Sequence, residues 1–130
     1  MKATQKLHEL GQSLWLDNIT RAMLDSGQLQ RYIEDYSVTG LTSNPSIFDK
    51  AINTGDYDEA IRAKAADGLR GEDLFFELAI EDLRRAADLL RPVHDRTDGV
   101  DGWVSLEVSP ELAYDTESTV TAARELEEET

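Results

Sequence analysis

Two carboxylates stand inside short apolar runs, where a charged group is costly. Asp17 lies near the end of LWLDNI (14–19), and Glu107 interrupts VSLEVSP (104–110). Both runs read as buried strands, and a buried carboxylate is unfavourable unless it is paired, hydrogen-bonded or used in chemistry. Two such strands in one short chain point to a common purpose, in which both acids are aimed into a shared pocket.

A further strand candidate also ends in polar residues. SVTGLTSN (37–44) carries Thr42, Ser43 and Asn44 at its end, directly before Pro45. In parallel α/β proteins ligands bind at the carboxyl ends of the strands, and barrel enzymes take catalytic groups from several strand ends. We therefore expect Asp17, Asn44 and Glu107 to converge on one site, although their spacing alone names no reaction.

Each of these three residues also has a plain structural interpretation. Asp17 is a favourable N-cap for a helix beginning near Thr20, and Asn44 is equally suited to cap the helix that starts at Pro45. Glu107 can pair with an arginine from a covering helix. The sequence leaves these alternatives open.

Helical periodicity and stop signals define the elements that must position the candidates. They predict a short helix before Gly11, two helical pieces around Gly27, a helix from Pro45 and another before Gly68. A long helix from residue 71 is expected to close at Arg91-Pro92, because proline disfavours helix in the residue before it. HDRTDGVDG (94–102) reads as a turn-rich loop, WVSLEVS (103–109) as the third strand, and Thr116 or Asp115 as the cap of a last helix.

The order strand, helices, strand, helices, strand, helix predicts an α/β fold with parallel strands. The strands lack clean alternation, so we expect them to be covered on both faces. Three parallel strands leave two open edges, which suggests the first portion of something larger.

Composition excludes several classes of protein. The chain has 130 residues, 40% of them hydrophobic, which suits one modest domain. Its net charge of −14 and the lack of a basic stripe argue against nucleic-acid binding. No apolar run is long enough to span a membrane, and no signal-peptide block opens the chain, so we expect a cytoplasmic protein. His8 and His94 are isolated, which makes a metal site unexpected, and Trp15 and Trp103 are predicted to be core or barrel-wall aromatics.

Three motifs together carry a family resemblance. QSLWLDNITRAMLDSGQLQ, GLTSNPSIFDKAI and DGWVSLEVSPELAYDT, in this order, resemble the first three β/α units of transaldolase, in the longer bacterial form typical of actinobacteria. The resemblance runs from about Gln12 to the end of the chain. It implies a (β/α)8 TIM barrel of the class I aldolase type, of which residues 1–130 are the N-terminal portion, ending before strand 4.

The resemblance also implies a reaction. Transaldolases move a dihydroxyacetone unit between sugar phosphates through a lysine Schiff base, without metal or organic cofactor. By motif, Asp17 matches the aspartate that contacts a substrate hydroxyl and assists proton transfer in carbon–carbon cleavage. Asn44 matches the residue that hydrogen-bonds the dihydroxyacetone moiety, with Thr42 and Ser43 beside it in the substrate-binding motif. Glu107 matches the glutamate that works through a water in forming and hydrolysing the Schiff base.

The sequence departs from the family pattern at the lysine. The family places that lysine on the fourth strand, in a segment close to IKIPAT, whereas these residues end in ELEEET (125–130). The four lysines present are Lys2, Lys6, Lys50 and Lys64, and none is predicted at a strand end. We therefore expect the whole enzyme to be catalytic and this chain alone to be inactive. The alternative is an acidic α/β module that binds or assembles, with itself or with a complementary piece of barrel.

Overall fold

A three-stranded parallel sheet forms the centre of the protein. The computed structural model describes residues 1–130, and its strands are β1 (Leu14–Asp17), β2 (Val38–Thr42) and β3 (Trp103–Ser105). They lie side by side in the order β1-β2-β3, all parallel. The predicted α/β fold, in which parallel strands alternate with helices, is confirmed.

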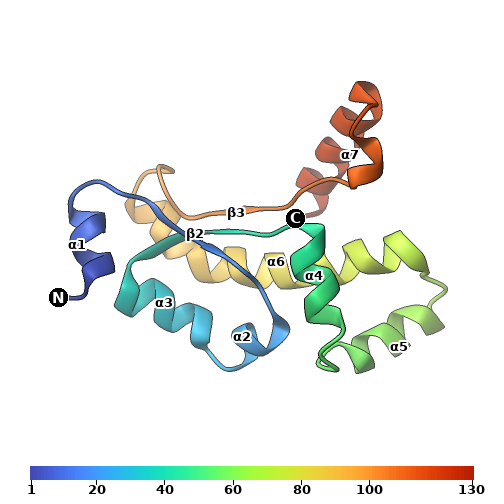
Figure 1. Cartoon of the computed structure of the whole chain (residues 1–130), viewed down its shortest axis with the longest axis horizontal. Helices are drawn as coiled ribbons and strands as arrows, with labels where there is room; N and C mark the ends of the chain where they lie inside the picture. Colours follow the sequence, from blue (N-terminus) through green and yellow to red (C-terminus); the bar gives the residue numbers. More distant parts are fainter.

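Helices fill the connections between the strands (Figure 1). The helix α1 (Ala3–Glu9) precedes the sheet, and the first crossover contains α2 (Arg21–Asp25) and α3 (Gln28–Tyr36). The second crossover contains α4 (Pro45–Ile52), α5 (Asp58–Ala66) and α6 (Gly71–Arg96). After β3 come the 3₁₀ turn η1 (Pro110–Leu112) and α7 (Thr116–Glu129). No helix combines the length and the apolar composition that crossing a membrane requires.

The predicted cap and stop residues account for most helix boundaries. Gly27 adopts a left-handed conformation (φ 73°) between α2 and α3, where a side chain would be strained. Asp115, one of the two predicted caps of α7, accepts the Ser118 N–H. Side-chain cap bonds of this kind mark where α2, α4 and α7 begin.

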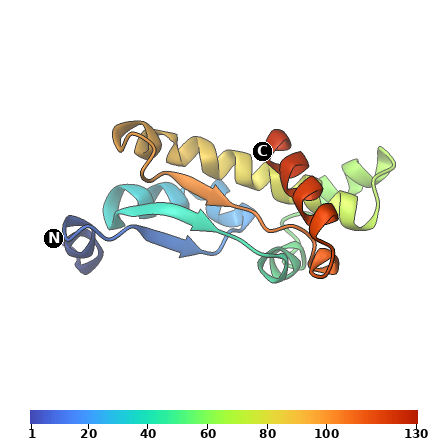
Figure 2. The ribbon, with the colours of Figure 1, turned by 90° about the horizontal axis from the view of Figure 1, so that it is seen from above.

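The core lies between the sheet and the helices on one side of it. Figures 1 and 2 show α2, α3 and α6 on a single face of the sheet, whereas α7 rises on the other side of the sheet plane, near the end of β3. The main buried cluster joins these elements: Ile19, Met23, Leu24, Leu29, Leu41, Phe48, Ala79, Leu83, Ala86, Leu90 and Val93.

The expectation that both faces are covered is wrong. Right-handed crossovers between consecutive parallel strands place every connecting helix on the same side. The other face, here called the open face, leaves Trp15 44% and Trp103 49% exposed. These tryptophans therefore line the surface that a barrel would turn inward, rather than the core under the helices.

Two predicted boundaries also differ from the structure. The helix α6 does not close at Arg91-Pro92 but continues to Arg96. Leu90 and Val93 are both buried in the main cluster, so their packing outweighs the loss of one helix hydrogen bond at Pro92. The third strand is shorter than WVSLEVS, because its partner β2 ends at Thr42 and leaves nothing to pair beyond Ser105.

Candidate active site

The open face carries two rows of side chains that strand register aligns. In the first row, Trp15 pairs with Gly40 and Gly40 pairs with Trp103. In the second row, two residues further towards the carboxyl ends, Asp17 pairs with Thr42 and Thr42 pairs with Ser105. Side chains two residues apart on a strand point to the same face. The row Asp17–Thr42–Ser105 is therefore polar and lies directly beyond an aromatic row.

Asn44 and Glu107 extend this polar row by one further step. Each lies two residues beyond a member of the row, Thr42 and Ser105, just past the end of its strand. Strands about 4.8 Å apart and a rise of about 3.3 Å per residue put the backbones of Asp17 and Glu107 roughly 12 Å apart. The predicted carboxylates and amide therefore follow the carboxyl ends of three neighbouring strands, and their convergence on one site stays a prediction.

The alternative interpretation of Asp17 as a helix cap does not hold. The cap of α2 is Thr20, whose hydroxyl accepts the Met23 N–H at 3.1 Å. Asp17 is exposed on the open face and forms neither a hydrogen bond nor an ion pair within the chain. Its carboxylate is therefore free to accept a proton or a hydrogen bond from a ligand.

Asn44 does cap α4, and this role sets the orientation of its amide. Its Oδ1 accepts the Ile47 N–H at 3.0 Å, so its Nδ2 points away from the helix end with no partner in the chain. An amide held in this way presents an N–H donor to an oxygen atom of a ligand. The cap and the proposed ligand contact use different atoms and are compatible.

Glu107 does not pair with an arginine. The arginines that form side-chain ion pairs are Arg21, Arg85 and Arg91, and their partners lie on α2 and α6. Glu107 is exposed, lies after β3 and takes part in no ion pair. It provides a second free carboxylate on the rim that carries Asp17.

Ser43 is placed differently from the other predicted site residues. Its side chain is fully buried, and its hydroxyl donates to the Ser105 carbonyl at 2.7 Å. It faces the helix side of the sheet and joins the ends of β2 and β3. Substrate binding by Ser43 stays a prediction, whereas the neighbouring Thr42 lies on the open face with a hydroxyl that has no partner.

Sequence reasoning missed Ser105 and Gly40 as parts of this surface. Ser105 is two residues before Glu107, and that spacing within a strand was a signal that it shares the face. At Gly40 any Cβ would overlap the Trp15 indole, so the indole lies directly on the β2 backbone. Trp15 and Trp103 form an aromatic floor below the polar row.

The lysines lie away from this rim. Lys64 on α5 pairs with Glu81 at 2.6 Å, and the Lys2 ammonium lies 3.6 Å from the centre of the Tyr36 ring. Lys6 and Lys50 are exposed on α1 and α4. No lysine of these residues is therefore placed to attack a carbonyl held beside Asp17.

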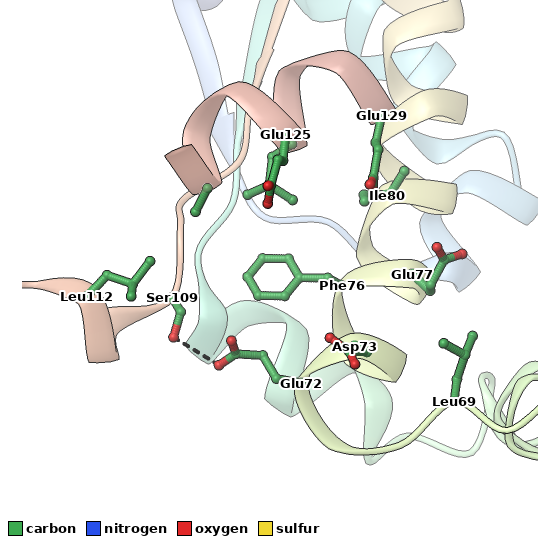
Figure 3. Close-up of a pocket in the computed structure, with 12 residues that line it drawn as sticks. Leu69, Glu72, Asp73, Phe76, Glu77, Ile80, Ser109, Leu112, Glu125 and Glu129 are labelled. Carbon is green, nitrogen blue, oxygen red and sulfur yellow. Dashed lines mark hydrogen bonds between the residues drawn. The ribbon is translucent and has the colours of Figure 1, made fainter. Parts of the chain in front are cut away.

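The hollows of the surface do not enclose this rim. One of about 380 Å³ lies between α6 and α7, where Ser109 donates to Glu72 at 2.9 Å (Figure 3). Its wall carries several carboxylates around Phe76 and Ile80. A hollow of about 470 Å³ runs along β3 and touches the site through Trp15, Trp103 and Ser105. The same hollow is also lined by α7, through Ala123, Leu126, Glu127 and Thr130.

Comparison with known proteins places this chain in a protein family. A family model described as transaldolase/fructose-6-phosphate aldolase matches residues 14–130, nearly the whole chain. The chain therefore belongs to the transaldolase/fructose-6-phosphate aldolase family.

Individual relatives narrow the resemblance within that family. The transaldolase of Thermobifida fusca is 50% identical over 123 residues, which cover 94% of this chain and 33% of the relative. The transaldolase of Saccharopolyspora erythraea is 48% identical over 123 residues, with the same coverage. Transaldolase 2 of Nostoc punctiforme is 42% identical over 120 residues, covering 92% of this chain and 32% of the relative. The chain matches an N-terminal third of actinobacterial-type transaldolases and spans about a third of their length.

Proposed function

We propose that this chain supplies the carboxylate and amide wall of a transaldolase active site. The reaction transfers a dihydroxyacetone unit from sedoheptulose 7-phosphate to glyceraldehyde 3-phosphate, giving erythrose 4-phosphate and fructose 6-phosphate in the pentose phosphate pathway. The observation that supports the proposal is that Asp17, Asn44 and Glu107 lie at, or two residues beyond, the carboxyl ends of three neighbouring parallel strands. Family membership supplies the reaction class.

The geometry suits proton transfer during carbon–carbon cleavage. An amine that condenses with the ketose carbonyl forms an iminium and releases water, and the iminium accepts the electron pair of the adjacent bond when that bond breaks. The hydroxyl on the departing aldehyde must lose its proton in the same step. Asp17 is an unpaired acceptor at the correct edge of the sheet for this role of general base.

We assign substrate binding to Asn44 and Thr42, and the handling of water to Glu107. The free Nδ2 of Asn44 donates to a hydroxyl oxygen of the dihydroxyacetone unit, and the unpartnered Thr42 hydroxyl reaches the same ligand. Glu107 holds the water that adds to, or leaves from, the carbinolamine carbon. We assign the amine to polypeptide other than these 130 residues, because all four lysines lie off the sheet.

A chimaera tests this function directly. The 130 residues replace the matching third of the Thermobifida fusca transaldolase, and we expect a folded, active enzyme. Asp17→Asn and Glu107→Gln should each lower its kcat by about 10²–10⁴-fold, the range for loss of a general acid or base. A chimaera that folds but has no activity would refute the proposal.

Borohydride trapping locates the amine. With fructose 6-phosphate, the chimaera should gain a reduced adduct on a lysine of the Thermobifida portion, and the 130-residue chain alone should gain none. An adduct on Lys2, Lys6, Lys50 or Lys64 would contradict the division of the site proposed here.

One observation favours a second function, that of an assembly module. The chain exposes 8176 Å², roughly 1,300 Å² more than the value of about 6,900 Å² expected for a compact monomer of its mass. A standard interface covers about 800 Å² per partner, so the excess exposed area of the chain is large enough for one. Sedimentation of the chain alone separates the two functions: a discrete, well-folded oligomer favours the module, and a chain that requires the rest of a barrel favours the enzyme.

A further inference from the structure

A buried ionic cluster lies beside the candidate site and has no part in the proposed chemistry. Tyr57, at the start of α5, and Asp82, in the middle of α6, are both fully buried. The Tyr57 hydroxyl donates to one Asp82 oxygen, and the Arg21 Nε donates to the other at 2.9 Å. Burial raises the pKa of Asp82, although the Tyr57 hydroxyl and the Arg21 charge favour its ionised form.

Arg21 is held by its backbone as well as by its side chain. Its N–H donates to the Tyr57 oxygen at 3.1 Å, and its guanidinium carbon lies 4.5 Å from the centre of the Tyr57 ring. Its Nη2 donates to Glu81 at 3.1 Å, and Glu81 also accepts from Lys64 at 2.6 Å. The guanidinium uses two separate nitrogens for two carboxylates, an arrangement that a lysine ammonium cannot reproduce.

This cluster fixes the short segment that follows Asp17. Arg21 is four residues beyond Asp17, and between them Ile19 is fully buried in the main core. The turn is therefore attached to the helix layer at Ile19, at the Arg21 N–H and at the Arg21 side chain. The Asp17 backbone pairs with Thr42 at the last position of β1, but its carboxylate has no bond in the chain, so its placement also depends on the segment that follows.

We propose that Arg21 is a positioning residue for Asp17, and that Tyr57 and Asp82 hold it in place. This inference rests on the proposed function of Asp17 as general base. A buried ion pair is a weak source of stability, since well-packed apolar residues often serve as well. Its directional bonds are suited instead to placing one stretch of backbone, and displacement of a catalytic group by about 1 Å can cost about 10²-fold in rate.

The test compares two ways of loosening the contact between α2 and α6. Asp82→Asn and Tyr57→Phe weaken the buried cluster while keeping side-chain volume. Arg85→Gln is the matched control, because Arg85 pairs with Asp25 at 2.6 Å between the same two helices, with both side chains largely exposed. Arg21→Lys tests whether charge alone suffices.

The activity arm uses the chimaera with the Thermobifida fusca portion. Asp82→Asn and Arg21→Lys should each lower kcat by about tenfold or more with KM within about twofold, since a misplaced base slows chemistry without weakening binding. Arg85→Gln should leave both constants unchanged. If Asp82→Asn and Arg85→Gln give the same constants in a folded chimaera, Arg21 has no positioning role.

The second arm needs no activity and uses the 130-residue chain. Amide hydrogen exchange at Arg21, and ¹⁵N relaxation across residues 17–21, should show greater mobility in Asp82→Asn and Tyr57→Phe than in Arg85→Gln. An inactive parent chimaera would count against the proposed function only, and this arm would still decide the positioning role. Equal mobility in all three variants would overturn it.

Discussion

Two adjacent hydroxyl residues at the end of β2 should have opposite phenotypes when each is removed. Ser43 is fully buried on the helix side of the sheet, and its hydroxyl donates to the Ser105 carbonyl at 2.7 Å. Thr42 lies on the open face, and its hydroxyl has no partner in the chain. The pair therefore separates a bond that holds the sheet together from a group that is available to a ligand.

The loss of stability expected for Ser43→Ala follows from one buried hydrogen bond. Losing it removes about 0.5–1.5 kcal/mol of net hydrogen-bond stability and leaves the Ser105 carbonyl short of a partner, which brings the total to about 1–2 kcal/mol. For 130 residues, an unfolding entropy of about 2.1 cal/mol/K per residue converts this loss to a fall of roughly 4–7 °C in Tm. The kcat and KM of the chimaera should stay within about twofold of the parent, because the hydroxyl does not reach the open face.

Thr42→Val should give the reverse result. The substitution keeps the branched shape and removes a hydroxyl that bonds nothing in the chain, so the free energy of unfolding should change by less than about 0.5 kcal/mol. Loss of a neutral hydrogen bond to substrate should lower kcat/KM of the chimaera by about 2- to 10-fold. Thermal unfolding by circular dichroism and steady-state kinetics measure both variants, with the parent as reference. If Ser43→Ala alters KM at unchanged Tm, the assignment of the two faces at the end of β2 is wrong.

Three further predictions concern titration and helix stability. Burial, followed by the hydrogen bond to Asp82, raises the pKa of Tyr57. The folded state therefore keeps a proton that the unfolded state releases, and the free energy of unfolding falls as pH rises above about 10. Alkaline denaturation monitored at 295 nm should show this loss in the parent and not in Tyr57→Phe. The Ser118 backbone N–H, followed by the Ser118 hydroxyl, lowers the pKa of Asp115. The contribution of Asp115 to the stability of α7 is therefore present above its ordinary pKa and is lost as pH falls through the lowered value. Helix content measured by circular dichroism should fall on acidification more in the parent than in Asp115→Ala, and an equal fall in both would contradict this. Pro92→Ala restores an N–H inside α6 and should raise the free energy of unfolding by about 1–3 kcal/mol in urea titrations, whereas a decrease would show that the helix is adapted to the proline.

Local signals in the sequence predicted what depends on local physics. The caps at Asn44 and Asp115 and the stops at Gly27 and Gly68 were readable because each acts within four residues of itself. The long helix was predicted too short, because the rule about Pro92 is local while the packing of Val93 is not. Burial of both sheet faces was predicted wrongly because apolar composition does not say which partner covers a strand.

The Arg21–Tyr57–Asp82 cluster could not be predicted from local signals in the sequence. Its bonds join residues 25 to 61 positions apart, and no motif records such a pairing. One signal was available: Asp82 stands four residues after Leu78 and four before Ala86, inside the apolar face of α6. An acid at such a position needs a buried partner, although the sequence does not say which arginine supplies it.

The two rows of the open face explain why the apolar runs tolerate their carboxylates. Trp15 and Asp17 are neighbours on the same face, as are Trp103 and Ser105, so β1 and β3 each present an aromatic residue followed by a polar one, while β2 contributes Gly40 and Thr42. Gly40 leaves room between them, since any Cβ there would overlap the Trp15 indole. The indoles form an apolar floor on which a ligand can rest, while the polar row meets its hydroxyls. The Asp17 carboxylate is therefore not buried in the core at all: it is exposed beside an apolar floor, and in the proposed site its desolvation is completed only when the ligand binds.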